Sequence, residues 1–317
     1  MERRYHSLVA RVGFLGPRGT FAEEALLTQP DLAAAEQVAF PTVPHVINAV
    51  EAGDVDFGLV PLENSIDGTI TVTVDTLAFD TELLVQREVD LPVSLHLCAN
   101  PGTRLVDVKR VVSHPSPFGQ CRVWLSRELP DADLVVANST ADAAAQVAAS
   151  GEHDVASIGT AYGARLHGLE LLASEVEDHP ENQTRFVLVG KGVPAPTGHD
   201  KTSIVCFQRE NRPGSLLAML QEFAARAINL TKLESRPTKR ELGQYCFFMD
   251  FEGHIADELV ADCLRTLMAR QADVKFLGSY PVAGEEGPAR REAASEAWAR
   301  ASTWVDGLRS QVRDAEP

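Results

Sequence analysis

The chain has 317 residues, an apolar fraction of 44% and a formal net charge of -16. A chain of this length exceeds the size that one hydrophobic core usually supports, so two domains are expected. Its lysines and arginines are not clustered, which argues against nucleic acid and anionic membranes as partners, because both require a positive surface. Any anionic ligand must therefore be held by a few local donors.

The cysteine pattern argues against a structural metal site and against disulfide bonds. The five cysteines are dispersed and form neither a Cys-x-x-Cys pair nor an ordered Cys/His spacing, so we expect no zinc site and no disulfide framework. Neutral buried thiols in a reducing compartment are the expected state. Arg11 and the Gly16-Pro17 turn interrupt the first apolar stretch too early for a signal peptide, and no apolar run is long enough to span a membrane. We therefore expect a cytoplasmic protein.

The first predicted elements form a strand, a turn and a helix. The strand covers Val12–Leu15, the turn Gly16–Gly19, and the helix runs from Phe21 to about Leu27. Thr20 and Glu23 have the spacing of a capping box at the start of that helix. A glycine turn and a helix N-terminus present backbone N–H groups to an anion. The glycine spacing does not match a nucleotide-binding motif, so a small carboxylate fits better.

A second polar segment is expected at the same edge of the sheet. A helix is predicted over Pro44–Ala52, followed by a strand over Val55–Val60 that ends at Pro61. This strand delivers Glu63-Asn64-Ser65 to the edge, either as ligand contacts or as a turn with a helix cap. Helical spacing then predicts a helix over Ile70–Ala78, although its β-branched residues favour a strand.

The segment Ser113–Cys121 is rich in polar residues and proline. We expect its prolines to hold an extended loop before a helix over Phe118–Leu129. A stiff loop of this kind can fix Ser113 and Gln120 as ligand contacts. His114 is a candidate acid or base, but a histidine before a proline is as often structural.

Other segments of the first half suggest two similar lobes. Strands are expected over Pro92–Ala99, Leu134–Val136 and Val155–Ile158, and Ser139 to Asp142 caps an alanine-rich helix. The order helix, Gly-x-x-Asp and strand occurs twice, at Gly53 and at Gly151. Two α/β lobes with a cleft between them would explain the repeat, and so would a common turn.

A third polar segment leads into a buried strand, Phe186–Val189, which Gly190 closes. Residues at the mouth of such a strand often bind ligands. Thr184 offers a hydroxyl, and Arg185 offers a planar fork of donors that suits a carboxylate. The alternative is a polar loop with Arg185 in a surface ion pair.

In the last third of the chain, the sequence pattern predicts a separate domain that follows a linker at residues 191–200. Its elements have the order βαββαβ of a ferredoxin-like domain. They are expected over Thr202–Gln208, Ser215–Ala227, Leu230–Ser235, Tyr245–Glu252, Asp257–Arg270 and Val274–Tyr280. In the tail, one amphipathic helix is predicted, docked on the body or on another subunit, from the spacing of Trp298, Ala301, Val305, Leu308 and Val312.

Five motifs together resemble the monofunctional bacterial prephenate dehydratases over roughly residues 11 to 281. They are Gly16-Pro-Arg-Gly-Thr-Phe21, Pro61-Leu-Glu-Asn-Ser65, Ser113-His-Pro with Gln120-Cys121, Asn182-Gln-Thr-Arg-Phe186 and Glu234-Ser-Arg-Pro237. The resemblance implies an α/β catalytic domain at residues 10–190, two-lobed and similar to type II periplasmic binding proteins. It also implies a βαββαβ ACT domain at 201–281 that senses phenylalanine, with a helical tail at 282–317.

The resemblance also implies an activity, which is the conversion of prephenate to phenylpyruvate in phenylalanine biosynthesis. Loss of carbon dioxide and water makes the substrate ring aromatic, so no metal or other cofactor is expected. The assembly implied is a homodimer or homotetramer that holds L-phenylalanine between paired ACT domains. Here Ser215 stands where the family's Gly-Ala-Leu motif has alanine, which puts effector affinity in doubt.

The residues that we expect to act fall into three groups. The catalytic group is Thr184, Asn64, Ser113 and Gln120, with Thr184 in the central role that the resemblance gives it. The substrate-binding group is Arg185, Thr20, Ser65 and Phe186. The effector-binding group is Gly214, Ser215, Leu216, Leu217, Glu234, Ser235, Arg236 and Pro237.

Two other functions compete with this hypothesis. Arogenate dehydratase performs the same chemistry on an amine-bearing substrate. A non-catalytic sensor would use the two lobes and the ACT domain only to bind small molecules, but it would not need a donor aimed at a leaving hydroxyl.

Overall fold

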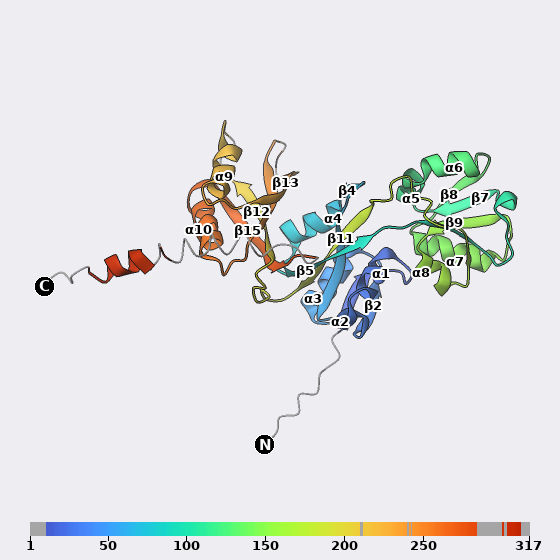
Figure 1. Ribbon diagram of the computed structural model, residues 1–317, viewed down its shortest axis with the longest axis horizontal. Coiled ribbons are helices and arrows are strands. Elements are labelled where there is room, and N and C mark those ends of the chain that lie inside the picture. Colours follow the sequence, from blue (N-terminus) through green and yellow to red (C-terminus); the bar gives the residue numbers. More distant parts are fainter. Residues whose placement is uncertain are drawn as a thin grey trace, which may run out of the picture. The chain divides into compact units, whose positions relative to one another are not determined.

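The computed structural model describes residues 11–209, 212–239, 241, 243–283, 300 and 303–311 (Figure 1). The chain divides into two compact units. The first contains Met1–Leu83 and Glu88–Gly190, and the second contains Leu84–Arg87 and Lys191–Pro317.

The first unit has two lobes, and lobe 1 is built on a sheet with the strand order β2-β1-β3-β11-β5. Its strands are β1 (Arg11–Leu15), β2 (Glu36–Phe40), β3 (Phe57–Asn64), β5 (Leu84–Pro92) and β11 (Gln183–Gly190), with the short β4 (Gly68–Thr69) paired to β3. The first four residues of β5, Leu84–Arg87, belong to the second unit. Its helices are α1 (Phe21–Leu27), α2 (Pro30–Ala33), α3 (Val43–Ala52) and α4 (Thr71–Asp75), which continues as a π turn over Thr76–Asp80. Strand β11 follows the last strand of lobe 2 along the chain and pairs antiparallel with β3, so the chain returns to lobe 1 at this strand.

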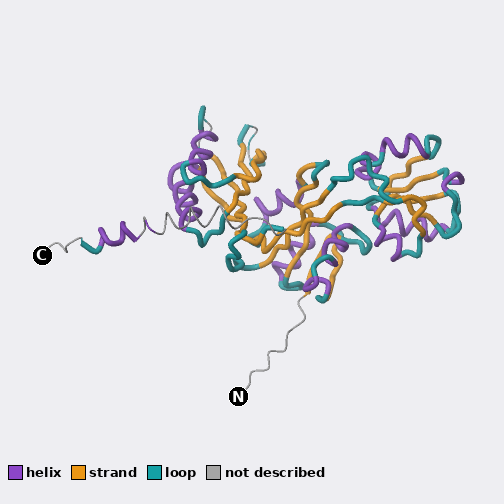
Figure 2. Tube along the Cα trace, viewed as in Figure 1, coloured by secondary structure: helices purple, strands orange, loops and turns teal. Residues whose placement is uncertain are grey.

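Lobe 2 contains a five-stranded sheet with helices on both faces (Figure 2). Its strands are β6 (His96–Ala99), β7 (Arg110–Ser113), β8 (Asp133–Val136), β9 (Val155–Gly159) and β10 (Glu170–Ala173), in the order β10-β6-β9-β7-β8. Its helices are α5 (Pro115–Gln120), α6 (Arg122–Glu128), α7 (Thr140–Ser150) and α8 (Ala161–Leu166), with a 3₁₀ turn at Leu105–Asp107. One core packs α6 on the sheet, and a second packs α7 and α8 on it.

The repeated Gly-x-x-Asp motif marks equivalent helix ends in the two lobes. Gly53 ends α3 with φ +82°, and Gly151 ends α7 with φ +64°. Glycine adopts this left-handed conformation without the steric cost that a Cβ carries. The predicted two-lobed α/β body is confirmed.

The second unit has the predicted ferredoxin-like order. Its elements are β12 (Asp200–Gln208), α9 (Ser215–Ala224), β13 (Leu230–Pro237), β14 (Tyr245–Glu252), α10 (Glu258–Thr266), a π turn (Leu267–Gln271) and β15 (Ala272–Pro281). The sheet has the order β13-β14-β12-β15. Residues such as Met219, Phe223 and Cys263 from the two helices share a buried core with residues of the sheet, and the βαββαβ prediction is confirmed.

Two predictions about proline were wrong. Strand β3 does not stop at Pro61 but continues to Asn64, because β1 pairs only as far as Leu59 and the proline lies beyond that neighbour, beside a register shift in β11. The prolines of the Ser113–Cys121 segment do not hold an extended loop. They form the first turn of α5, where a missing N–H leaves no helical hydrogen bond unmade.

Other element boundaries also differ from the prediction. The strand expected over Pro92–Ala99 is the end of β5, a short connection and β6. Strands β2 and β10 and helix α8 were not predicted. In the tail, residues 303–309 are helical, with Val305 and Leu308 partly exposed, whereas Trp298, Ala301 and Val312 lie outside the described residues. Within the described ranges, no helix is both long and apolar enough to cross a membrane.

Candidate functional site

Thr184 and Asn64 lie opposite each other on the antiparallel pair β11 and β3. The Asn64 Nδ2 donates to Thr184 Oγ1 at 2.9 Å and to the carbonyl oxygen of Gln183 at 3.1 Å. The Asn64 Oδ1 in turn accepts from the backbone N–H groups of Ile66 and Asp67. A hydroxyl oxygen that accepts a hydrogen bond still has its own proton to donate. The Thr184 hydroxyl therefore keeps its proton available for a hydrogen bond.

Asn182 joins this pair to lobe 2. Its Oδ1 accepts from Asn64 Nδ2 at 2.8 Å, and its Nδ2 donates to the Oε1 of Gln120 at 3.0 Å. Gln120 is on α5, and its Nε2 donates to Asp67 at 2.9 Å. Ser65 also takes part, because its Oγ accepts from the backbone N–H of Gln183 at 3.0 Å. The structure thus brings together the predicted Thr184, Asn64, Gln120 and Ser65.

Ser113 and His114 have structural partners. The Ser113 hydroxyl is fully buried and donates to the carbonyl oxygen of Ile158 at 2.8 Å, which ties β7 to β9. His114 is exposed and caps α5, with its Nδ1 accepting from the N–H of Ser116 at 3.4 Å. Both contacts lie within lobe 2, so these two side chains support the segment that carries Gln120.

The glycine turn does not offer all its N–H groups to a ligand. The buried Glu23 carboxylate accepts from Gly19 N at 2.6 Å and from Arg18 Nε at 2.8 Å. The expected capping box is therefore wrong in detail: Glu23 reaches the residue before the cap, and the Thr20 hydroxyl donates to Leu15 O at 3.0 Å. The adjacent Glu23 raises the pKa of the Arg18 guanidinium, so Arg18 stays charged.

Arg185 is paired with acidic residues of lobe 1. Its Nε contacts the carboxylate of Glu88 on β5, and its Nη1 lies 3.9 Å from the carboxylate of Glu63. The side chain is only 14% exposed. Phe186, the next residue, is 2% exposed and packs in the lobe 1 core. Substrate binding by these two residues stays a prediction, and Arg185 would have to bind a ligand beside its ion pair.

The cysteines match the prediction of neutral buried thiols. All five lie among the described residues, are buried and form no disulfide bond. Burial raises the pKa of Cys98, Cys121, Cys206 and Cys263 to about 12. A thiol with such a pKa carries almost no thiolate at neutral pH, so these residues are not nucleophiles.

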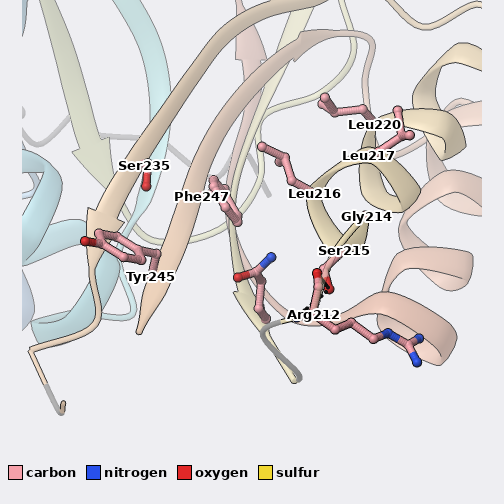
Figure 3. A pocket seen from close by; sticks show the side chains of 10 residues that line it. Arg212, Gly214, Ser215, Leu216, Leu217, Leu220, Ser235, Tyr245 and Phe247 are labelled. Carbon is pink, nitrogen blue, oxygen red and sulfur yellow. Dashed lines mark hydrogen bonds between the residues drawn. The ribbon is translucent and has the colours of Figure 1, made fainter. Parts of the chain in front are cut away.

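The second unit contains a cavity of about 460 Å³ between α9 and the sheet (Figure 3). It is lined by the predicted Gly214, Ser215, Leu216, Leu217 and Ser235, and by Gln208, Arg212, Leu220, Tyr245 and Phe247. Leu216 and Phe247 point toward each other across it (Figure 3).

Three predicted effector residues do not line this cavity. They are Glu234, Arg236 and Pro237, on the same strand as Ser235. Glu234 and Arg236 flank Ser235, and successive side chains of a strand point to opposite faces of the sheet. Their carboxylate and guanidinium groups lie 3.6 Å apart in an ion pair. These residues can shape the strand but do not wall the cavity.

Comparisons with known proteins identify the family of the chain. The prephenate dehydratase family model matches residues 12–193, and the ACT domain model matches residues 202–267. The chain belongs to the prephenate dehydratase family. It is 45% identical to prephenate dehydratase of Mycolicibacterium vanbaalenii, over 94% of this chain and 98% of that protein.

Two solved structures show how far the family resemblance extends. A prephenate dehydratase from Arthrobacter aurescens in complex with L-Phe is 38% identical, with a TM-score of 0.86 over 95% of this chain and 99% of that one. A quorum-quenching acylase is 28% identical, with a TM-score of 0.75 over 86% of this chain and 98% of that one. Because the same fold supports another chemistry, the function of this chain must be argued from its site.

Two residues of the hydrogen-bond network around Thr184 were not among the predicted site residues. Asn182 was noticed as part of a polar segment, but its central place in the hydrogen-bond network was not. Asp67 gave no signal, since an acidic residue in a turn is common in any soluble protein. Both residues contact Gln120 of lobe 2, and the spacing of motifs along the sequence does not show which residues of the two lobes lie close together.

Proposed function

We propose that Thr184 is the hydrogen-bond donor to the departing hydroxyl during the decarboxylating dehydration of prephenate to phenylpyruvate. The observation that supports this proposal most directly is the 2.9 Å hydrogen bond in which Thr184 Oγ1 accepts from Asn64 Nδ2. This bond uses a lone pair of the hydroxyl and leaves its proton for the substrate. The activity is that of a lyase, as in the family to which the chain belongs.

The chemistry requires little from the protein beyond position and polarity. Decarboxylation supplies the electrons that expel the ring hydroxyl, and the aromatic ring of the product favours both losses. A threonine hydroxyl is too weak an acid to act alone as a general acid near neutral pH. Thr184 therefore stabilises charge that develops on the leaving oxygen, as preorganised donors do in other active sites. Asn64 orients Thr184 directly, and Gln120 does so through Asn182. Ser113 supports the segment of lobe 2 that carries Gln120.

We assign substrate binding to Arg185, Thr20, Ser65 and Phe186 as part of the same proposal. Ser65 lies nearest to the Thr184 network, through its bond to Gln183 N. Arg185 provides the positive charge for a carboxylate. Phe186 acts from the core, by fixing the strand that carries Thr184.

The second unit is proposed as the phenylalanine sensor. The cavity beside α9 combines the N-terminus of this helix, whose dipole favours an anion, with the apolar Leu216 and Leu217. This combination suits an amino acid with an apolar side chain. Residues 10–190 would then form the catalytic domain, 191–200 the linker, 201–281 the regulatory domain and 282–317 a tail. A cytoplasmic homodimer or homotetramer completes the proposal, on the strength of the family resemblance.

The test is phenylpyruvate formation by the purified protein from prephenate, with arogenate in a parallel assay. We expect turnover of prephenate without added cofactor. Thr184→Val, which is nearly isosteric, should reduce kcat by roughly a hundredfold or more, because losing one preorganised donor typically costs that much. The Michaelis constant should change little. Turnover within about tenfold of wild type would disprove the role of Thr184, and a preference for arogenate would change the substrate.

A further inference from the structure

A continuous chain of side-chain hydrogen bonds runs from Asp67 to Thr184. Gln120 Nε2 donates to Asp67 Oδ2 at 2.9 Å, and Asn182 Nδ2 donates to Gln120 Oε1 at 3.0 Å. Asn64 Nδ2 then donates to Asn182 Oδ1 at 2.8 Å and to Thr184 Oγ1 at 2.9 Å. Asn64, Gln120 and Asn182 are all buried, so leaving any of these amides unpaired would be unfavourable.

The groups at the two ends of this series of hydrogen bonds determine which way each amide side chain faces. A primary amide has a donor end and an acceptor end, and it can bind either way round, whereas a carboxylate only accepts. Asp67 therefore requires the NH₂ of Gln120 to face it, which turns the Gln120 oxygen toward Asn182. At the other end, the backbone N–H groups of Ile66 and Asp67 hold the Asn64 oxygen at 3.0 and 2.9 Å. Both constraints come from the same turn between β3 and β4.

The Asp67 contact also joins the two lobes of the first unit. Asp67 belongs to lobe 1, and its partners Gln120 and Ser116 are on α5 of lobe 2. Asp67 itself is an exposed residue, so its carboxylate reaches the buried amides from the surface. A hydrogen bond to a charged group is roughly twice as strong as one between neutral groups. This end of the chain is therefore the stronger constraint on Gln120.

We propose that Asp67 is a positioning residue for the reaction. Its carboxylate fixes the amide sense of Gln120 and, through it, of Asn182 across the lobes. The Asn182 oxygen then faces the Asn64 NH₂ that donates to Thr184, and the Thr184 proton faces the substrate. Asp67 touches neither Thr184 nor the reacting atoms in this arrangement. The inference rests on the proposed role of Thr184 and adds the device that orients it.

The direct test is Asp67→Asn, which keeps the size of the side chain but permits either amide direction and removes the charge. We expect kcat to fall roughly tenfold with KM within about twofold, the pattern of a loss felt in the transition state. Asp107→Asn is the matched control, since it neutralises another exposed carboxylate, whose partner is Arg104 in lobe 2. It should leave both constants unchanged. Thermal unfolding of each variant would confirm that it is folded.

A reversed pair sharpens the test. Gln120→Glu alone places two carboxylates face to face and should nearly abolish turnover. Adding Asp67→Asn gives the new carboxylate a donor and lets its other oxygen accept from Asn182, as Gln120 does. The double variant should therefore recover at least about tenfold in kcat over Gln120→Glu.

Three results would overturn the proposal. They are a kcat for Asp67→Asn within about twofold of wild type, a change confined to KM, and a double variant no more active than Gln120→Glu. Wild-type protein and Asp107→Asn that both fail to form phenylpyruvate would instead disprove the proposed function. The two failures are thus distinguished in the same assay.

Discussion

Thr184 and Arg185 are adjacent in β11, yet their side chains have different surroundings. Thr184 accepts from Asn64 in the amide network, whereas Arg185 faces Glu88 and Glu63. Alternation along a strand separates neighbouring side chains in this way. A motif that places two chemically suitable residues side by side therefore does not place them in one site. The sequence favoured Arg185 as a carboxylate ligand and left a surface ion pair as the alternative; the observed ion pair is largely buried.

We expect Arg185→Lys to raise the KM for prephenate by roughly tenfold, because lysine retains the charge but loses the planar fork. Glu88→Gln is the matched variant, since it breaks the ion pair but keeps the guanidinium. It should lower the unfolding temperature without raising KM. Steady-state kinetics and thermal unfolding of both proteins measure the two effects. If Arg185→Lys binds prephenate as well as wild type does, Arg185 is structural.

At the scale of elements, predictions succeeded where apolar residues repeat with a clear period. All six elements of the ferredoxin-like unit were expected in the right order, because each alternates or repeats its apolar residues and is bounded by turns. Strand β5 was missed because Arg87, Glu88 and Asp90 interrupt its pattern. The buried Glu88 is compatible with a strand because Arg185 meets it from β11. That partner is distant in sequence, and the Asp67–Gln120 contact was missed for the same reason.

Strand β15 provides a prediction about packing. Gly278 has φ +138°, and a Cβ there would lie 2.6 Å from the carbonyl oxygen of Val85 and 3.0 Å from its nitrogen. Because these are backbone atoms, they cannot move aside as a side-chain end can. We expect Gly278→Ala to destabilise the second unit by about 2 kcal/mol or more, through overpacking and backbone strain. Gly192→Ala is the control, since Gly192 also has a positive φ but its Cβ would meet nothing within 4 Å. Equal urea midpoints for the two variants would show that the contact with Val85 is not restrictive.

At the scale of the whole molecule, the proposed catalytic network and the proposed effector cavity belong to different compact units of one chain. The Thr184 network lies in the first unit, and the cavity beside α9 lies in the second. Feedback therefore requires a coupling free energy between the units, typically about 1 to 3 kcal/mol. An energy of that size can be removed by changing one contact with the effector, while the catalytic unit remains folded. Coupling is also reciprocal: if phenylalanine weakens prephenate binding, prephenate must weaken phenylalanine binding by the same factor.

Gly214 is the position at which sensing can be removed separately. It precedes α9 with φ +87°, and a side chain there would have open space around its Cβ but would stand beside the N–H groups proposed to bind the effector's carboxylate. We expect Gly214→Val to keep uninhibited activity and to lose inhibition by phenylalanine. The substitution also carries a backbone cost, because a β-branched residue is strained at this φ.

Gly198→Val controls for that cost, since Gly198 has the same φ of +87° and equally open space but does not line the cavity. Inhibition curves and calorimetric titration with phenylalanine, on both variants and wild type, measure the result. Full inhibition of Gly214→Val, or its loss in Gly198→Val as well, would show that the response does not depend on this helix entry, and wild-type protein that binds no phenylalanine would leave the second unit without a regulatory role.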